Sequence, residues 1–151
     1  MKSEQAQVAA IIRKALKAHG IKCSVKSRSF SMGDAVDVKV FDQMPAAMAL
    51  IESEFSKYQY GRFNGMEDIY EYSNTNGDIP QTKFLHINNV ISSELKQKAW
   101  DWTRATFGGF DNSPADYSDI HNHDDYTAVN RTLSDSKGGF WFTVKPRQKA
   151  A

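Results

Sequence analysis

Strict alternation of apolar and polar side chains in two neighbouring segments constrains the fold of this chain more than any other feature of its sequence. In residues 21–29 the apolar residues Ile21, Cys23 and Val25 alternate with polar ones, and in residues 35–41 three valines alternate with Asp37 and Lys39. A period of two is the pattern of a half-buried strand, because successive side chains of a strand point to opposite faces. The connector over residues 29–34 contains Gly33 and Asp34, which favour a turn. The pattern therefore predicts a hairpin with one valine-rich face packed on a helix.

Apolar side chains at helical spacing predict three helices around this hairpin. The first spans residues 4–19, where one apolar stripe faces the core and the basic residues lie off it. The second begins at Pro45, since proline suits the first turn of a helix. The third is capped by Ser92 or Ser93 and ends near Phe107, before a pair of glycines.

Two further strands are predicted over residues 68–73 and 82–88, and an Asn-Gly turn between them predicts that they pair with each other. Beyond residue 110 the chain is irregular, apart from a short helix over residues 124–134 and a last strand over residues 140–145. The sequence thus predicts an α+β fold, in which a small, mostly antiparallel sheet packs against about three helices. The order is α-β-β-α-β-β-α, followed by the irregular C-terminal part with its last strand.

Length and composition limit the kind of protein. At 151 residues the chain is long enough to bury a sizeable core, and we expect residues 1–151 to form a single domain with a mobile tail over residues 146–151. No apolar run approaches the ~18 residues of a membrane span, and no signal-peptide pattern is present. The only cysteine, Cys23, lies on the apolar face of its segment, where we expect a core residue. A cytoplasmic protein that contacts no membrane is expected.

Charge is unevenly distributed along the chain, although the net charge is only +1. Residues 1–62 carry ten Lys/Arg and six Asp/Glu, a net charge of +4. Residues 63–135 carry five Lys/Arg and twelve Asp/Glu, a net charge of −7. The small overall charge argues against strong non-specific binding of nucleic acid, and the acidic middle of the chain is either a docking surface for a basic partner or a solvated face.

No recognised enzyme motif is present. The chain lacks the P-loop, the dinucleotide-binding glycine pattern, the H-E-x-x-H zinc motif and the G-x-S-x-G elbow, so we predict no cofactor and favour a binding protein over an enzyme. One segment, residues 121–125, places His121 and His123 beside two aspartates. Because imidazole and carboxylate groups bind divalent metals, these two histidines are kept as metal-binding candidates.

Residues 58–74 combine five aromatic rings with an arginine and two glycines, the densest such cluster in the chain. Exposed rings beside an arginine give large contact areas at a modest entropic cost. We expect the tip of this segment and the later acidic segment to contact a protein partner. The candidate residues are Tyr60, Arg62, Phe63, Asn64, Asp116, Asp119, Asp124 and Asp125. The alternative is that most of these rings fill the core.

Two short motifs carry a resemblance to a known family. They are the S-M-G-D connector at residues 31–34 and the G-x-F-x-G-M-x-D-x-Y segment at residues 61–70. In this order they resemble the twenty-ninth class of large polyvalent protein-associated domain, over about residues 5–105. Residues 110–145 lie outside the resemblance and are expected to be an extension particular to this protein. No catalytic residues are established for the family, so none is carried over.

The resemblance implies a genetic context, because such domains occur in phage and plasmid proteins that accompany mobile DNA into a new host. The first functional hypothesis is a non-enzymatic anti-defence protein that binds a protein complex of the bacterial host, such as a CRISPR or restriction complex. The alternative is a module that binds single-stranded nucleic acid through Lys22, Lys26 and Arg28 on the outer face of the first strand. A third hypothesis is a metal-dependent enzyme that uses residues 121–125.

Overall fold

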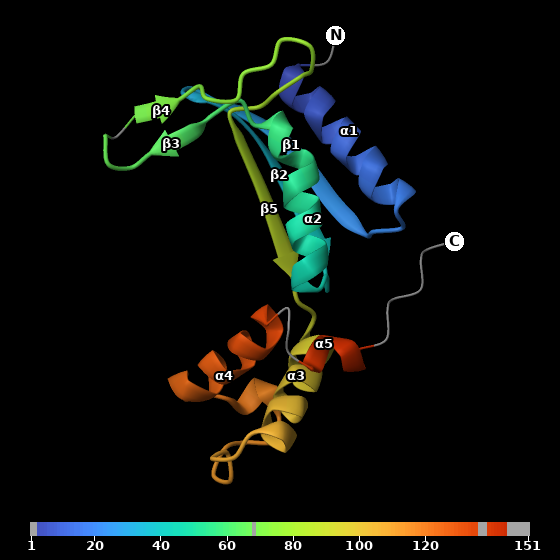
Figure 1. Ribbon diagram of the computed structural model, residues 1–151, viewed down its shortest axis with the longest axis vertical. Coiled ribbons are helices and arrows are strands. Elements are labelled where there is room, and N and C mark those ends of the chain that lie inside the picture. Colours follow the sequence, from blue (N-terminus) through green and yellow to red (C-terminus); the bar gives the residue numbers. More distant parts are fainter. Residues whose placement is uncertain (1–2, 68, 136–138, 145–151) are drawn as a thin grey trace. The chain divides into compact units, whose positions relative to one another are not determined.

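The computed structural model describes residues 3–67, 69–135 and 139–144, which fall into two compact units. Among these residues, unit 1 comprises residues 3–41 and 49–90, and unit 2 comprises residues 42–48 and 91 onward. Figure 1 shows the elements of both units. Within the described residues, no helix has the length and apolarity that crossing a membrane requires.

Helix α1 (Glu4–Ala18) forms as its sequence predicts. The hydroxyl of Ser3 accepts a hydrogen bond from the backbone N–H of Ala6, which satisfies one of the free donors at the helix start. Val8, Ile12 and Leu16 recur at four-residue intervals and are almost completely buried. The apolar stripe of α1 therefore packs on the sheet of unit 1, whereas its basic residues are exposed.

Strands β1 (Cys23–Phe30) and β2 (Gly33–Phe41) form the predicted antiparallel hairpin. Val36, Val38 and Val40 have no exposed surface, because they lie on the face of the sheet that α1 covers. Cys23 lies on the same face and is half-buried. The alternation in the sequence thus identified both strands and the face that each buries.

Strand β5 (Phe84–Val90) corrects the predicted pairing of residues 82–88. We expected this segment to pair with residues 68–73, but β5 lies parallel to β2, with Leu85 opposite Val36. The sheet has the order β1-β2-β5 and is mixed rather than mostly antiparallel. The physical reason is burial: the parallel pairing puts Leu85 and Ile87 beside the buried valines of β2, which a separate small hairpin could not do.

The crossover from β2 to β5 contains a helix and a second, smaller sheet. Helix α2 (Pro45–Phe55) and the short 3-10 helix η1 (Ser56–Tyr58) come first. Strands β3 (Arg62–Asn64) and β4 (Ile69–Glu71) then form a two-stranded antiparallel sheet. Strand β3 was not predicted, since three residues are too few for a recognisable pattern.

Unit 2 is helical, with α3 (Ser93–Thr106), η2 (Tyr117–Asp119), α4 (His123–Ser134) and α5 (Phe140–Thr143). Its buried core consists of Leu95, Ala99, Trp100, Ile120, Val129, Phe140 and Trp141. The predicted last strand is wrong, because residues 140–143 form α5; Lys145 lies outside the described residues, as does the tail 146–151. Phe140 and Trp141 are both buried. A helical turn can bury two adjacent side chains on one side, whereas a strand would send them to opposite faces.

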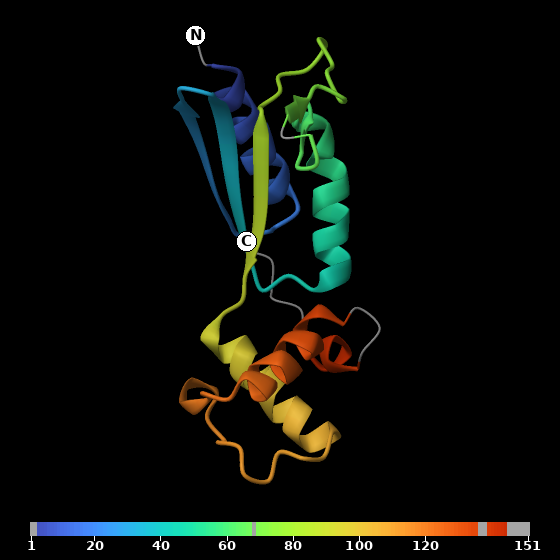
Figure 2. The ribbon, with the colours of Figure 1, turned by 90° about the vertical axis from the view of Figure 1, so that its left-hand side faces the viewer.

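The predicted α+β class is confirmed, and the order of elements agrees with the prediction up to α3 except for the additional strand. In unit 1, α1 and residues 49–55 of α2 lie on the same side of the sheet, as Figure 2 shows. This arrangement leaves the other side of the sheet without a covering helix within the described part of unit 1.

Candidate nucleic-acid interface

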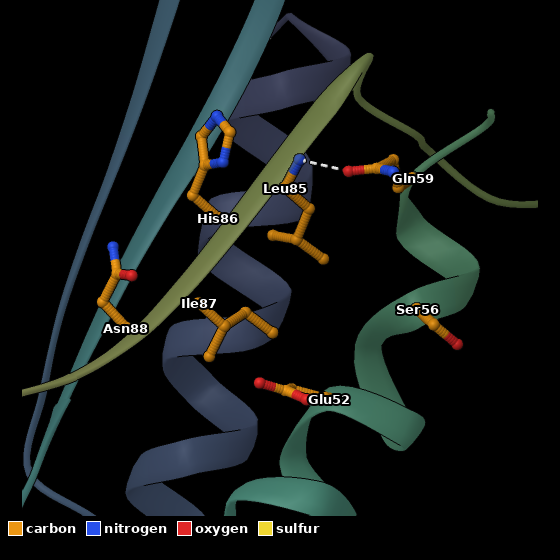
Figure 3. A pocket seen from close by; sticks show the side chains of 7 residues that line it. All are labelled: Glu52, Ser56, Gln59, Leu85, His86, Ile87 and Asn88. Atoms are coloured by element: carbon orange, nitrogen blue, oxygen red, sulfur yellow. Dashed lines mark hydrogen bonds between the residues drawn. The ribbon is translucent and has the colours of Figure 1, made fainter. Parts of the chain in front are cut away.

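The uncovered side of the three-stranded sheet, here called the outer sheet face, carries aromatic and basic side chains. The strand register assigns to it Ser24, Lys26, Arg28, Phe30, Ala35, Asp37, Lys39, Phe41, Phe84, His86, Asn88 and Val90. Figure 3 shows the division on β5, where His86 and Asn88 project on one side of the strand and Leu85 and Ile87 on the other. The lysines and His86 are exposed.

Three rings form a row across the outer sheet face. The Phe84 ring stacks on the Phe30 ring with centroids 6.2 Å apart, and on the His86 ring at 6.2 Å with an angle of only 5° between the planes. Phe30 and Phe84 come from β1 and β5, which flank β2, and Ala35 lies opposite Phe84 in the register. The small side chain of Ala35 lets the two phenyl rings meet across β2. Phe30 remains 39% exposed, so the row is accessible to a ligand.

Basic side chains lie around the ring row. The guanidinium of Arg28 lies 5.3 Å from the centroid of the Phe30 ring and is ion-paired to Asp37, with Nε and Oδ2 2.9 Å apart. Asp37 is the one acidic residue that the register assigns to the outer sheet face. Because Arg28 balances Asp37, the exposed Lys26 and Lys39 give this face a net positive charge.

Lysines also lie over rings at both ends of the outer sheet face. The Nζ atom of Lys22 lies 5.5 Å from the centroid of the Phe41 ring, and the Nζ atom of Lys83 lies 5.7 Å from that of Phe84. Such cation–π contacts hold the lysine stems against the protein while the ammonium groups stay near the surface. The positive charge therefore extends along the whole face.

The S-M-G-D motif positions the start of β5. The Oδ1 atom of Asp34 accepts hydrogen bonds from the Thr82 hydroxyl at 2.6 Å and from the Lys83 N–H at 2.9 Å, and the Met32 carbonyl accepts one from Lys83 Nζ at 2.8 Å. Gly33 has a φ of +152°, and a Cβ atom there would lie 2.6 Å from the Lys83 side chain. The motif thus requires glycine, and it fixes the residue that immediately precedes the ring row of β5.

The second motif reaches the same residue from the other side. The Tyr70 hydroxyl donates a hydrogen bond to the Lys83 carbonyl at 2.6 Å, and the Tyr70 ring meets the Phe84 ring edge-on at 5.6 Å. A Cβ atom on Gly61 would overlap the Glu71 carbonyl oxygen and lie 2.5 Å from the Tyr70 ring, so only glycine fits. Both motifs therefore support the position of Lys83 and Phe84.

A cluster of three tyrosines adjoins the ring row. Tyr60 stacks on Tyr72 with centroids 5.5 Å apart, and Tyr70 meets both edge-on. Burial raises the pKa of Tyr70 to about 12, and the neighbouring phenols contribute to the shift. Burial also raises the pKa of Tyr60, with a smaller contribution from the Asp34 carboxylate. Both phenols are therefore neutral at physiological pH and add no negative charge beside the basic face.

The predicted partner-binding residues of unit 1 divide into two kinds. Phe63 is 55% exposed and Arg62 is exposed, so both are accessible at the β3–β4 sheet. Tyr60 is half-buried in the tyrosine cluster. Asn64 is also half-buried; its side-chain amide donates to Glu71 at 3.0 Å and its oxygen accepts from backbone N–H groups of the turn. Tyr60 and Asn64 thus have structural contacts of their own.

The four predicted aspartates lie in unit 2. Asp116 accepts hydrogen bonds from the Ser118 hydroxyl at 2.8 Å and its N–H at 2.9 Å, and these bonds lower the pKa of the carboxyl group. Asp119 and Asp124 are exposed. Asp125 is buried and accepts a hydrogen bond from a serine hydroxyl at 3.0 Å. No observation tests whether these aspartates contact a partner, and that prediction stands as a prediction.

His121 and His123 are both exposed, and His123 is the first residue of α4. The Nδ1 atom of His121 lies 3.2 Å from the Asp119 carbonyl oxygen. In the described parts of the chain, no group of three or more His, Cys, Asp or Glu side chains is placed to hold a metal ion.

The sequence identified only part of the outer sheet face. Lys26 and Arg28 were predicted to project from the outer side of the first strand, and the register places them there. Lys39 was missed, although the alternation of its own strand indicates the same face. Phe84 and His86 could not be assigned to this face, because that requires knowing that β5 pairs with β2.

Fold and surface together define an α+β protein whose small sheet exposes one basic, aromatic face. The chain matches Large polyvalent protein associated domain 29 over residues 3–97, more than half of its length, and it belongs to that family. The resemblance drawn from the two motifs is thereby confirmed, and the family associates the chain with phage and plasmid proteins. No curated protein and no solved structure matches the chain.

Proposed function

We propose that this protein is an accessory protein of a phage or plasmid that binds single-stranded nucleic acid on the outer sheet face. The observation that carries the proposal is the stacked row Phe30–Phe84–His86, exposed on an uncovered sheet among lysines. Every base has an aromatic face, so stacking on protein rings is tolerant of sequence and is worth about 1–3 kcal/mol per base. A base-paired duplex keeps those faces in its own stack, which favours a single strand.

Phosphate contacts would supply the rest of the affinity. Lys22, Lys26 and Lys39 lie on the same face as the rings, so a strand whose bases stack on the row brings its phosphates within their reach. The net charge of the whole chain is only +1, and attraction is therefore local to this face. For about three or four neutralised phosphates, the logarithm of the association constant should fall against the logarithm of salt concentration with a slope of roughly −2 to −3.

Fluorescence anisotropy with labelled oligo-dT, oligo-rU and a duplex of equal length tests the proposal. At ~50 mM salt, where phosphate contacts are strongest, we expect saturable binding of the single strands and weaker binding of the duplex. Adding oligo-dU, which differs from oligo-rU only in lacking the 2′-hydroxyl, shows whether that hydroxyl contributes. Absence of single-strand binding at low salt, or equal affinity for the duplex, would contradict the proposal.

Matched substitutions locate the binding surface. Removing a ring from the row, as Phe30→Ala or His86→Ala, should weaken single-strand binding about tenfold, because one stacking contact is lost. The control Phe142→Ala removes a ring that is 76% exposed in unit 2 and should have no effect. Lys39→Ala should reduce both the affinity and the salt slope, whereas Lys98→Ala, an exposed lysine of unit 2, should change neither.

A protein partner is the second candidate, favoured by exposed apolar side chains at the β3–β4 sheet. Phe63, Met66 and Ile69 are 55%, 98% and 49% exposed. Such a cluster would suit an anti-defence protein that binds a host protein complex, as the family context allows. Capture from a bacterial lysate should then yield a stoichiometric protein with the wild type and lose it with Phe63→Ser. Capture that is unchanged by this substitution would count against a contact there.

A further inference from the structure

The two edges of the three-stranded sheet differ in how they are protected from pairing with another strand. At β1, the Arg13 guanidinium donates a hydrogen bond to the Val25 carbonyl at 2.7 Å, and Lys26 and Arg28 add charge to the strand. Charged side chains of this kind discourage the addition of a further strand. Strand β5, at the other edge, reads FLHINNV and has neither a charged residue nor a proline.

Residues 58–60 pair with Thr82 just before β5, but no described strand continues this pairing along β5 itself. Just before β5, the Thr82 N–H donates to the Tyr58 carbonyl at 2.8 Å, and the Tyr60 N–H donates to the Thr82 carbonyl at 3.2 Å, which makes a parallel bridge between Gln59 and Thr82. The N–H of Leu85 then donates to the side-chain oxygen of Gln59 at 2.7 Å, as Figure 3 shows. The Gln59 amide therefore occupies the place of a peptide carbonyl from an added strand.

A groove of about 360 Å³ lies between β5 and α2 beside this point. Its lining consists of Glu52, Ser56, Gln59, Leu85, His86, Ile87 and Asn88. Because hydrogen-bonding directions alternate along a strand, the Ile87 N–H points to the same edge as that of Leu85. Within the described part of the chain, no strand pairs with β5 on this side.

We propose that this groove binds an extended segment of a partner protein as an added strand beside β5. A row of outward-pointing peptide N–H and C=O groups is complemented by a second extended backbone. At Leu85, the first position of this row, the side-chain amide of Gln59 already supplies the acceptor that such a backbone would offer. Leu85 and Ile87 offer apolar contacts, and the exposed Glu52 carboxylate on α2 favours a basic residue. The segment thus carries apolar side chains that contact Leu85 and Ile87 and a lysine or arginine within reach of Glu52. This proposal is independent of nucleic-acid binding.

A second copy of this chain is a less suitable occupant than a single segment. Helix α2 forms one wall of the groove, as Figure 3 shows, so it stands along the edge that a second sheet would have to approach. Pairing of two β5 strands would bring the α2 helices of both copies to the same place. A single extended segment, only one strand wide, avoids that conflict.

The test uses the full chain and a fluorescent synthetic peptide in which lysine and valine alternate. A matched peptide carries N-methyl groups on alternate backbone amides, which removes the ladder donors but keeps every side chain. We expect the first peptide to bind saturably and to slow hydrogen exchange of the Ile87 amide, and the methylated peptide to bind at least about tenfold more weakly. Equal binding of both peptides, or no binding of either, overturns the proposal.

Charge reversal on α2 gives a second, independent readout. Glu52→Arg should weaken the alternating peptide about fivefold, whereas Glu54→Arg, an exposed glutamate of the same helix outside the groove, should not. Equal effects of the two substitutions overturn the proposal, because they indicate general attraction of a cationic peptide. Protection of the Ile87 amide that rises with protein concentration in the absence of peptide also overturns it, since a second copy then occupies the edge.

Discussion

At the scale of single residues, Lys83 connects the two motifs of the family. Its N–H donates to Asp34, its carbonyl accepts from Tyr70, and its ammonium group donates to the Met32 carbonyl. A lysine with all of these groups engaged is a structural residue despite its charge. The motif residues that contact it therefore act mainly by placing the start of β5, and the side chains of the outer sheet face lie outside both motifs.

Gly61 gives a prediction that belongs to this scale. The substitution Gly61→Ala should lower the free energy of unfolding by at least about 2 kcal/mol, because a methyl group would overlap the Glu71 carbonyl and the Tyr70 ring. Urea denaturation followed by circular dichroism measures the change.

Gly65 is the matched control, since a Cβ atom there has no neighbour within 4 Å and the residue belongs to the same motif. Gly65→Ala should change the free energy of unfolding by no more than about 0.5 kcal/mol. Similar losses in both variants would show that the close approach at Gly61 is not what the motif requires.

At the scale of elements, the position of β5 depends on one carboxylate in another strand. Asp34→Ala removes the acceptor of the Lys83 N–H and leaves the fully buried Thr82 hydroxyl with only the Phe84 carbonyl at 3.5 Å, so the free energy of unfolding should fall by about 2–4 kcal/mol. Combining it with Thr82→Val in a double-mutant cycle should reveal a coupling energy of about 1 kcal/mol or more between the two side chains.

Asp37→Ala is the appropriate comparison for the Asp34 variant. It removes an exposed ion pair with Arg28, and such pairs contribute about 0–1 kcal/mol. If Asp34→Ala costs no more than Asp37→Ala, the buried hydrogen bonds of the S-M-G-D motif do not hold β5 in place.

At the scale of the whole molecule, the described residues form two compact units with buried apolar side chains in each, and the tryptophans report on one of them. Trp100, Trp102 and Trp141 all belong to unit 2. Val129→Ala, which truncates a completely buried side chain of unit 2, should lower the midpoint of the fluorescence transition. Gly61→Ala should instead reduce the protection of β2 amides against hydrogen exchange and leave the fluorescence transition in place.

These two variants also test the predicted single domain over residues 1–151. If each variant shifts both the fluorescence transition and the exchange of β2 amides, the two cores unfold as one cooperative unit. If each shifts only the probe of its own unit, the chain comprises two separately stable parts.

The candidate binding face could be predicted only in part from sequence. The alternation in the first hairpin placed Lys26 and Arg28 on one face, and the same rule applies to Lys39. The ring row needed the pairing of β5, because Phe84 and His86 alternate equally well against any neighbouring strand. The ring-rich segment at residues 58–74 predicted a binding tip, whereas several of its rings pack on one another and on Phe84 at the end of the sheet.

The sequence by itself determined the local elements of this protein. Helices α1, α3 and α4 and the β1–β2 hairpin follow from side-chain periodicity, caps and turns, which act over a few neighbouring residues. Only the tertiary structure decided that β5 pairs parallel to β2, that residues 140–143 form a helix and that three rings align across the sheet. These outcomes depend on burial and on contacts between residues that are distant in sequence. One such contact is the hydrogen bond from Thr82 to Asp34, which no local pattern encodes.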